Sequence, residues 1–386
     1  MELNWYLIFA VALVESFVAA ILLTELVRRI AVRWNVVDSP GHRKMHDTPV
    51  PLLGGIAIFT AFNGVVLINL GLLLQAERFG FEWIEARVLD YFGKDPQQKL
   101  AGIFAGGAII FILGVVDDVK DLSPEVKLVG QITAALVLVT SGVRLDLFIA
   151  AGLETLPVVE ALSESTRHVL AVGISGAATM FWIVLMTNSL NFLDNMDGLC
   201  AGVSSIAALS FFLCLLPAEQ YFVCVMLVVF AGSMSGFLFH NFSPAKIFMG
   251  DAGSMFAGYI LATVAVLGTY TRGGAPSIAI AAPLLALCVP LFDTFSVIYI
   301  RWKNGESIMK GDKRHFSHRL VELGMEPRKA VDFIFLVAAV TGMGGAMLPR
   351  VDRVGTVIIL AQTAGVFLLI VLLMNAGRNS GEFGDG

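Results

Sequence analysis

Two adjacent carboxylates, Asp117 and Asp118, follow an uncharged apolar stretch, FAGGAIIFILGVV, at residues 104–116. Like charges side by side repel each other, and a bound cation relieves that repulsion. The pair is therefore a candidate metal or catalytic site, although a solvated pair at a helix end is a simpler explanation of this motif alone. Asp121, in the same acidic segment, is a secondary candidate.

A second group of carboxylates and amides lies in NSLNFLDNMDG, residues 188–198. Asp194 and Asp197 are three residues apart and would be neighbours on a helix. Asn188 and Asn191 place amides beside them, which is more polar chemistry than a helix cap requires. Asp251, in MGDAGS, is open to two interpretations: it caps the following helix, or it binds a metal.

Basic and histidine side chains accompany these carboxylates. Lys127 opens an apolar run, where it could bind an anion or simply extend toward the membrane surface. His315 and His318 in RHFSH resemble a zinc pair, but no third ligand is near and the adjacent Arg314 favours an anion. Carboxylates that hold Mg²⁺, or Mn²⁺ in its place, together with bases that bind phosphate, predict phosphoryl transfer.

The composition indicates what kind of fold must position these residues. The 386 residues are 57% apolar and only 15% charged, against about 25% charged in a typical soluble domain, and the mean hydropathy is +0.80. Several apolar runs are long enough to cross a hydrocarbon core of about 30 Å. The chain is therefore predicted to be an integral membrane protein, and its net charge of −5 gives no case for a nucleic-acid partner.

Eleven apolar segments are predicted to span the membrane as helices, because backbone groups in lipid must find their partners within the segment. They are 4–27, 53–74, 99–116, 126–142, 169–187, 198–216, 219–239, 253–268, 277–300, 332–348 and 355–376. We expect an all-α polytopic bundle that forms a single catalytic membrane domain over residues 1–386.

The positive charges predict the orientation of the bundle. One side of the eleven-span arrangement holds 17 of the 26 Lys and Arg residues, which places the N-terminus outside and the C-terminus in the cytoplasm. The candidate residues then gather on cytoplasmic connections, where they would form one active site. These connections are 33–52, 117–127, 188–198, 240–254 and 301–331.

Asp293, in PLFDT, lies inside a predicted span, where an ionisable residue is a functional candidate. Two other classes of protein could use such residues. An ion-coupled secondary transporter would place charges near the midplane and repeat broken helices in two halves. An intramembrane aspartyl protease would pair Asp251 with Asp293. Most candidates instead crowd one edge of the membrane, which favours the phosphoryl-transfer enzyme.

Six motifs between residues 38 and 320 carry a family resemblance: SPGHRKMHDTPVPLLGGIAI, DDVKDLSPEVKLVGQ, NSLNFLDNMDGL, FMGDAGSMFAGY, PLFDTFSV and DKRHFSHRL. In type and order they resemble the polyprenyl-phosphate N-acetylhexosamine-1-phosphate transferases of glycosyltransferase family 4. The resemblance implies Mg²⁺-dependent transfer of N-acetylglucosamine 1-phosphate from a UDP-sugar to undecaprenyl phosphate, with release of UMP. It also implies a homodimer in the bacterial cytoplasmic membrane that initiates a cell-envelope polysaccharide.

The resemblance assigns roles to the motif residues. Metal binding would fall to Asp118, Asp194 and Asp251; catalysis to Asp117, Asp118, Asp194 and Asp197; and contact with nucleotide, phosphate or sugar to Arg43, Lys44, His46, Lys127, Asn188, Asn191, Arg314, His315 and His318.

The branch within the family is indicated by two motifs. The branch that transfers phospho-MurNAc-pentapeptide usually has DDxxK and three consecutive histidines, whereas this chain has DDVKD and HFSH. Both differences favour the N-acetylglucosamine branch. That branch often reads HIHH, however, and here Phe316 and Ser317 separate the two histidines. The phospho-MurNAc-pentapeptide transferase activity therefore remains the alternative.

Overall fold

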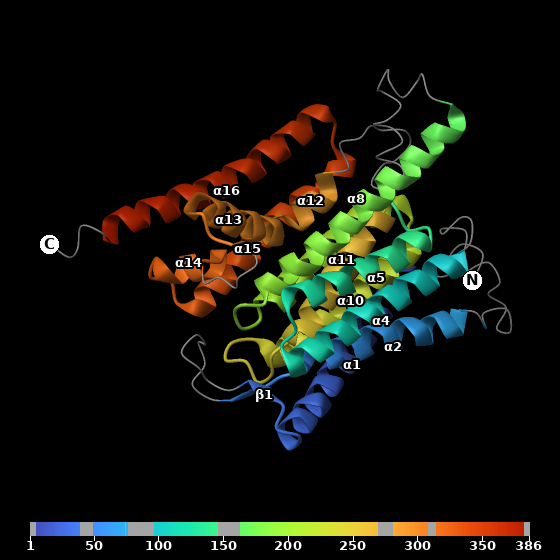
Figure 1. The fold of residues 1–386 in the computed structure, drawn as a ribbon, viewed down its shortest axis with the longest axis horizontal. Helices are drawn as coiled ribbons and strands as arrows, with labels where there is room; N and C mark the ends of the chain where they lie inside the picture. Colours follow the sequence, from blue (N-terminus) through green and yellow to red (C-terminus); the bar gives the residue numbers. More distant parts are fainter. Residues whose placement is uncertain are drawn as a thin grey trace.

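The computed structural model describes residues 5–38, 49–73, 75, 96–145, 163–268, 281–307 and 314–381. Long helices dominate these residues and run roughly alongside one another, so that α1 begins and α16 ends at opposite ends of the bundle (Figure 1). Nine of the described helices are long and apolar enough to cross a membrane. The expected all-α membrane fold is confirmed.

The helices follow the predicted apolar segments. Their bounds are α1 (Trp5–Arg33), α2 (Gly54–Leu73), α4 (Pro96–Lys120), α5 (Pro124–Thr140), α8 (Glu164–Leu193), α9 (Leu199–Leu215), α10 (Tyr221–Asn241), α11 (Gly250–Leu267), α12 (Ala281–Ala286), α13 (Cys288–Asn304), α14 (Phe316–Glu322), α15 (Pro327–Met347) and α16 (Arg353–Gly381). Short 3₁₀ turns follow α9 and α15.

Two elements separate the nine candidate spans from the eleven expected. Helix α5 has only 17 residues, which is near the lower limit for crossing a bilayer. The predicted span 277–300 is divided at Leu287 into α12 and α13, and its first four residues lie outside the described residues.

A two-stranded antiparallel pair closes one end of the bundle. Strand β1 (Val37–Asp38) pairs with β2 (Val50–Pro51). The chain after β2 runs beside the segment that leads into α11, because Phe248 N donates to Pro51 O at 2.8 Å and Gly55 N donates to Met249 O at 2.8 Å. The connection between α1 and α2 therefore contacts the segment that carries the MGD motif.

Helix α11 lies at the centre, and every residue from Ala252 to Val266 is buried. Small residues let its neighbours approach it closely. A Cβ added at Gly55 in α2 would lie 2.2 Å from Gly253 N, and one added at Gly114 in α4 would lie 2.3 Å from Ala252 Cα. The close approach at Gly114 carries the end of α4, with its two aspartates, to the first turn of α11.

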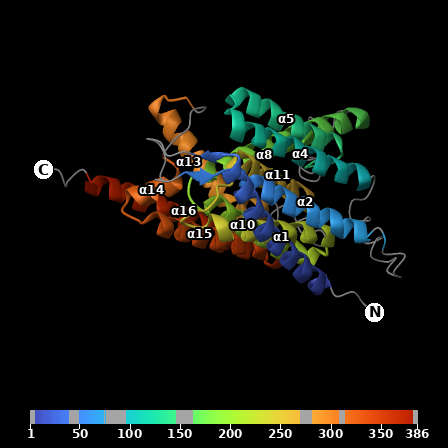
Figure 2. The same ribbon diagram turned by 90° about the horizontal axis from the view of Figure 1, so that it is seen from below.

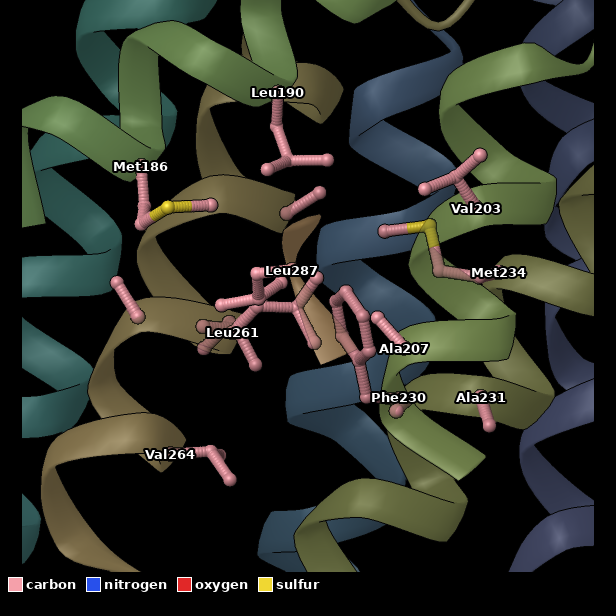
Figure 3. Packing of buried hydrophobic residues seen from close by; sticks show 14 of the residues in the cluster. Met186, Leu190, Val203, Ala207, Phe230, Ala231, Met234, Leu261, Val264 and Leu287 are labelled. Atoms are coloured by element: carbon pink, nitrogen blue, oxygen red, sulfur yellow. The ribbon is translucent and has the colours of Figure 1, made fainter. Parts of the chain in front are cut away.

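Apolar packing fills the bundle beyond this contact. Met186 of α8, Leu261 of α11 and Phe230 of α10 are among the buried side chains that meet there (Figure 3). Helices α4 and α5 lie on one side of the bundle and α15 and α16 on the other (Figure 2). Helix α16 exposes large side chains such as Leu368 and Leu372, which suits contact with lipid.

Candidate active site

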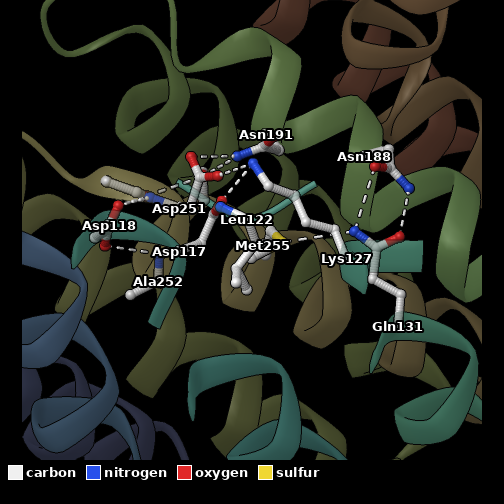
Figure 4. Close-up of polar contacts among 12 residues, drawn as sticks. Asp117, Asp118, Leu122, Lys127, Gln131, Asn188, Asn191, Asp251, Ala252 and Met255 are labelled. Carbon is white, nitrogen blue, oxygen red and sulfur yellow. Dashed lines mark hydrogen bonds and ion pairs between the residues drawn. The ribbon is translucent and has the colours of Figure 1, made fainter. Parts of the chain in front are cut away.

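Four helix ends meet at the polar end of the bundle: the ends of α4 and α8 and the beginnings of α5 and α11 (Figures 1 and 4). Lys127 Nζ lies 2.9 Å from Asp251 Oδ2 and also pairs with Asp117 Oδ2. Asn191 Nδ2 donates to Asp251 Oδ1 at 3.0 Å. One ammonium group therefore lies between two carboxylates that are far apart in the sequence.

Asp118 has a different environment from its neighbour. Its Oδ1 accepts a hydrogen bond from Asp251 N at 2.7 Å, and its Oδ2 accepts one from Ala252 N at 3.2 Å. These N–H groups belong to the first turn of α11, where the helix itself offers no partner. Asp118 therefore caps α11 from another helix, and Asp251 does not act as the cap.

The turn into α11 requires glycine at position 250. Gly250 has φ +71, and a Cβ there would lie 2.6 Å from Asp118 Oδ2. Only glycine combines a left-handed backbone with so close an approach. The MG pair of the motif thus allows Asp118 to hold the turn that points the Asp251 side chain at Lys127.

Asp117 is buried and fixes the turn after α4, since its Oδ1 accepts from Leu122 N at 2.7 Å. Its Oδ2 has no hydrogen bond and is left to the ion pair with Lys127. Asp121 stands in the same turn with φ +51 and an exposed side chain. Of the acidic residues in this segment, Asp117 and Asp118 are the ones that reach the other helices in the described structure.

Asp194 ends α8 next to this cluster. Burial, followed by the negative charges of Asp251, Asp118 and Asp197, raises the pKa of the Asp194 carboxyl to about 8. Asp197 lies further along the turn, where its Oδ2 accepts from Ala245 N at 2.9 Å and fixes the loop before α11. The structure thus brings the DDVKD, NSLNFLDNMDG and MGD motifs to one end of the bundle, where several carboxyl groups lie near the single ammonium of Lys127.

The residues present fit a small, hard cation. Asp117 and Asp251, whose carboxylates share Lys127, supply oxygen donors, and Asp117 Oδ2 is a buried oxygen without a hydrogen bond. Among the described residues, no group of three or more His, Cys, Asp or Glu side chains is placed so that it could hold a metal ion. Mg²⁺ does not need three protein ligands, because it usually takes one or two carboxylates and completes its shell with water and substrate phosphates.

A neutral contact lies one turn further into the bundle. Asn188 Nδ2 donates to Gln131 Oε1 at 2.7 Å, Gln131 Nε2 lies 3.3 Å from Asn188 Oδ1, and the same nitrogen lies 3.5 Å from Met255 Sδ (Figure 4). Asn188 also donates to Val184 O. The resemblance assigns Asn188 to nucleotide binding, but in this structure its amide bonds to Gln131 and Val184. The sequence analysis did not name Gln131 as a site residue. The signal for it was a polar glutamine inside an apolar run, four residues after Lys127.

The RHFSH segment lies against the end of α8. His315 Nδ1 is 2.7 Å from Asp293 Oδ2, and Ser317 Oγ donates to Asn195 Oδ1 at 2.6 Å. The rings of Phe192 and His315 are 6.1 Å apart, centre to centre. Ser317, a departure from the family motif, therefore holds the segment to the polar turn that carries Asp194, and Ser317 was not predicted as a site residue.

The remaining predicted residues are placed as follows. Arg314 forms an ion pair with Glu306, and the His318 ring lies 6.5 Å from that of His315. Arg43, Lys44 and His46 lie outside the described residues. Asp293 contacts His315 and Asp251 contacts Lys127 and Asn191, so these two aspartates do not form the dyad that a protease would need.

Comparison with known proteins matches the chain to one family and to relatives with similar names. The model of the family described as Glycosyl transferase family 4 matches residues 100–269. A probable undecaprenyl-phosphate N-acetylglucosaminyl 1-phosphate transferase of Bacillus subtilis (strain 168) is 33% identical over 338 residues, covering 88% of this chain and 84% of the relative. A decaprenyl-phosphate N-acetylglucosaminephosphotransferase of Mycobacterium tuberculosis is 34% identical, covering 90% and 85%. An undecaprenyl-phosphate alpha-N-acetylglucosaminyl 1-phosphate transferase of Yersinia pestis is 25% identical, covering 94% and 89%.

Proposed function

The chain belongs to glycosyl transferase family 4, and from this we propose that it transfers N-acetylglucosamine 1-phosphate from UDP-N-acetylglucosamine to undecaprenyl phosphate, releasing UMP. The relatives' names support the polyprenyl phosphate acceptor and the N-acetylglucosamine group. The product would initiate a cell-envelope polysaccharide.

One observation carries the proposal: Lys127 lies between Asp117 and Asp251 at the end of an apolar helix bundle. A cation and a phosphate group could both bind there. The edge of the membrane is also where a water-soluble nucleotide sugar and the phosphate of a long-chain lipid can meet. A transporter would need comparable groups at the midplane.

The protein's main task in this reaction is positioning. The acceptor is a phosphate monoester with a second pKa near 6, so it is largely dianionic at pH 7 and needs little activation as a nucleophile. One of its oxygens would form a bond to the β-phosphorus of the donor. The bond from that phosphorus to the bridging oxygen would break, and UMP would leave with the electron pair.

Each residue of the cluster has a proposed role in this step. The resemblance implies Asp118, Asp194 and Asp251 as metal ligands, but both oxygens of Asp118 accept N–H groups, so Asp251 and Asp117 would hold Mg²⁺. When bound, the ion would neutralise the diphosphate and stabilise the leaving UMP. Lys127 would bind a phosphate oxygen, and Asn191 would keep the Asp251 carboxylate in place.

A two-step route through an aspartyl phosphate would need a free aspartate as nucleophile. Both oxygens of Asp118 accept hydrogen bonds from N–H groups, and Asp117 is bound to Lys127 and Leu122 N. These contacts favour direct attack by the acceptor. Incubation of the enzyme with labelled donor in the absence of lipid tests this, because a trapped phosphoenzyme would exclude the direct route.

We also propose the membrane orientation and assembly. The polar end of the bundle would face the cytoplasm, with the N-terminus outside and the C-terminus inside, because most Lys and Arg residues fall on that side. The location would be the bacterial inner membrane. The homodimer that the resemblance implies would be tested by mass determination of the purified protein in detergent.

The decisive experiment is an assay of UMP release with the purified full-length protein. UDP-N-acetylglucosamine and undecaprenyl phosphate should give UMP with Mg²⁺ and none with a chelator or without lipid. UDP-MurNAc-pentapeptide in the same assay tests the alternative activity. Turnover with the pentapeptide donor alone would replace the proposed substrate, and no UMP from either donor would overturn the proposed function.

A further inference from the structure

Asp293 is a fully buried carboxylate that the proposed reaction does not use. It lies in α13, six residues after the break at Leu287, with 0% of its surface exposed. Its two oxygens have different partners. Oδ1 accepts a hydrogen bond from Phe316 N at 2.5 Å, and Oδ2 lies 2.7 Å from His315 Nδ1.

These contacts determine which ring nitrogen of His315 carries hydrogen. An ionised carboxylate only accepts hydrogen bonds, so Nδ1 must be the protonated nitrogen that donates to Oδ2. In histidine, the hydrogen bond of one ring nitrogen sets the state of the other. Nε2 of His315 is therefore the nitrogen that remains for another partner.

The surroundings place this ring at the edge of the proposed active site. His315 immediately precedes α14, which is held by Asp293 on one side and by the Ser317–Asn195 hydrogen bond on the other. The ring lies beside Phe192, two residues before Asp194. His315 retains 7% of its exposure, and none of the hydrogen bonds in the described part of the chain involves its Nε2.

We propose that Asp293 is a positioning residue. It holds His315 in the Nδ1–H form, so that Nε2 is available to contact the sugar-phosphate end of the donor. This inference rests on the proposed function and adds to it. The carboxylate acts through the histidine and does not touch the substrate. The Asp293 carboxylate serves both the ring nitrogen of His315 and the first N–H of α14.

The substitution Asp293→Asn tests the tautomer without any substrate. Phe316 N–H can donate only to the amide oxygen of the asparagine, which turns the amide NH₂ toward Nδ1. Nδ1 must then accept, and the hydrogen moves to Nε2. We expect ring-¹⁵N histidine spectra of the protein in lipid bilayers to show His315 as Nδ1–H in the native chain and as Nε2–H in the variant.

The signal of His315 can be identified among the six histidines by its loss in His315→Ala. Asp332→Asn, at an exposed position of α15, is the matched control and should leave the spectrum unchanged. The same tautomer in the native chain and in a folded Asp293→Asn variant would overturn the inference. If Asp293→Asn does not fold, the native spectrum decides, because an Nε2–H form there would also overturn it.

Activity then tests whether Asp293 acts through His315. We expect Asp293→Asn and His315→Ala each to lower kcat/KM for UMP release by about 10²-fold. The double variant should lose no more than about two-fold beyond His315→Ala, because the two residues act as one unit. Asp293→Glu, which keeps a carboxylate, should recover part of the loss, and Asp332→Asn should match the native rate.

Two results would contradict the proposal that Asp293 acts through His315. Losses that multiply in the double variant would show that Asp293 acts independently of His315. A loss in Asp293→Asn that follows its fall in melting temperature, with His315→Ala fully active, would reduce Asp293 to a structural role. Absence of UMP release by the native protein would overturn the proposed function instead, and the tautomer measurement would still stand on its own.

Discussion

Helices α5, α8 and α11 build two polar layers that lie one helical turn apart (Figure 4). The charged layer consists of Lys127 from α5, Asn191 from α8 and Asp251 from α11. The neutral layer consists of Gln131 from α5, Asn188 from α8 and Met255 from α11.

The two layers differ in whether their contacts are complete. In the neutral layer, Gln131 and Asn188 bond to each other through both amides, and nothing in that exchange calls for a ligand. In the charged layer, one ammonium faces Asp251 and Asp117, with Asp194 nearby. Buried like charges are costly unless an opposite charge relieves them. The same three helices therefore carry a neutral pair whose amides satisfy each other and, one turn away, a single ammonium that the carboxylates of Asp117 and Asp251 share.

Removing a carboxylate from the charged layer should have the largest effect. Asp251→Asn loses the charge that pairs with Lys127 and is proposed to hold Mg²⁺. We expect turnover to fall by on the order of 10³-fold, with a weaker dependence of the remaining rate on Mg²⁺ concentration. Initial rates of UMP release across a Mg²⁺ series measure both. Met255→Leu, in the neutral layer, is the control, and near-normal turnover of folded Asp251→Asn would remove Asp251 from the metal site.

Removing the ammonium group should have the next largest effect. Lys127→Ala leaves Asp117 and Asp251 without their shared partner and removes a phosphate-binding cation. We expect kcat/KM for the donor to fall by about 10²-fold, the lower end of the range for loss of one preorganised hydrogen-bond donor. Lys127→Arg should recover only part of this, because a planar guanidinium cannot replace a compact ammonium between two carboxylates. Full activity of Lys127→Ala would leave the lysine as a structural ion pair.

Stability should respond to Asp118, which holds the turn at the start of α11. Asp118→Ala removes the acceptor of two N–H groups at the start of α11 and should lower the free energy of unfolding by about 2 kcal/mol. Asp118→Asn keeps one acceptor oxygen and should lose less. Unfolding of the purified protein in mixed micelles measures this. Asp121→Ala, on the exposed turn nearby, should change stability by no more than about 0.5 kcal/mol, and equal effects at 118 and 121 would refute the capping role.

The neutral layer should give the smallest effects. Gln131→Leu leaves Asn188 without its main partner and should cost about 1 kcal/mol of stability, with kcat/KM changed by no more than about three-fold. The double variant Gln131→Leu/Asn188→Leu should be closer to the native chain than either single variant, because neither amide is then left unpaired. A donor KM that rises in Asn188→Leu but not in Gln131→Leu would show that Asn188 contacts the nucleotide.

The sequence predicted the class of fold and the set of acidic motifs. Apolar length and the need for internal backbone hydrogen bonds are local properties, so the helices fall where expected. The division of 277–300 at Leu287 was not expected, because hydropathy does not register a break between two apolar helices. Adjacent Asp117 and Asp118 also appear equivalent in the sequence. Only the packing of α4 on α11 at Gly114 directs one toward Lys127 and the other to the α11 backbone.

Apolarity by itself determined which segments leave water, but lipid and protein interior are both apolar, so it does not distinguish between them. Helices α11 and α16 are both apolar spans, yet α11 is enclosed by its neighbours and α16 faces outward. The pairs Gln131–Asn188 and Asp293–His315 were likewise decided by helix packing, since each joins residues from different elements. Side chains become partners only when tertiary structure brings their helices together, and no local pattern encodes that distance.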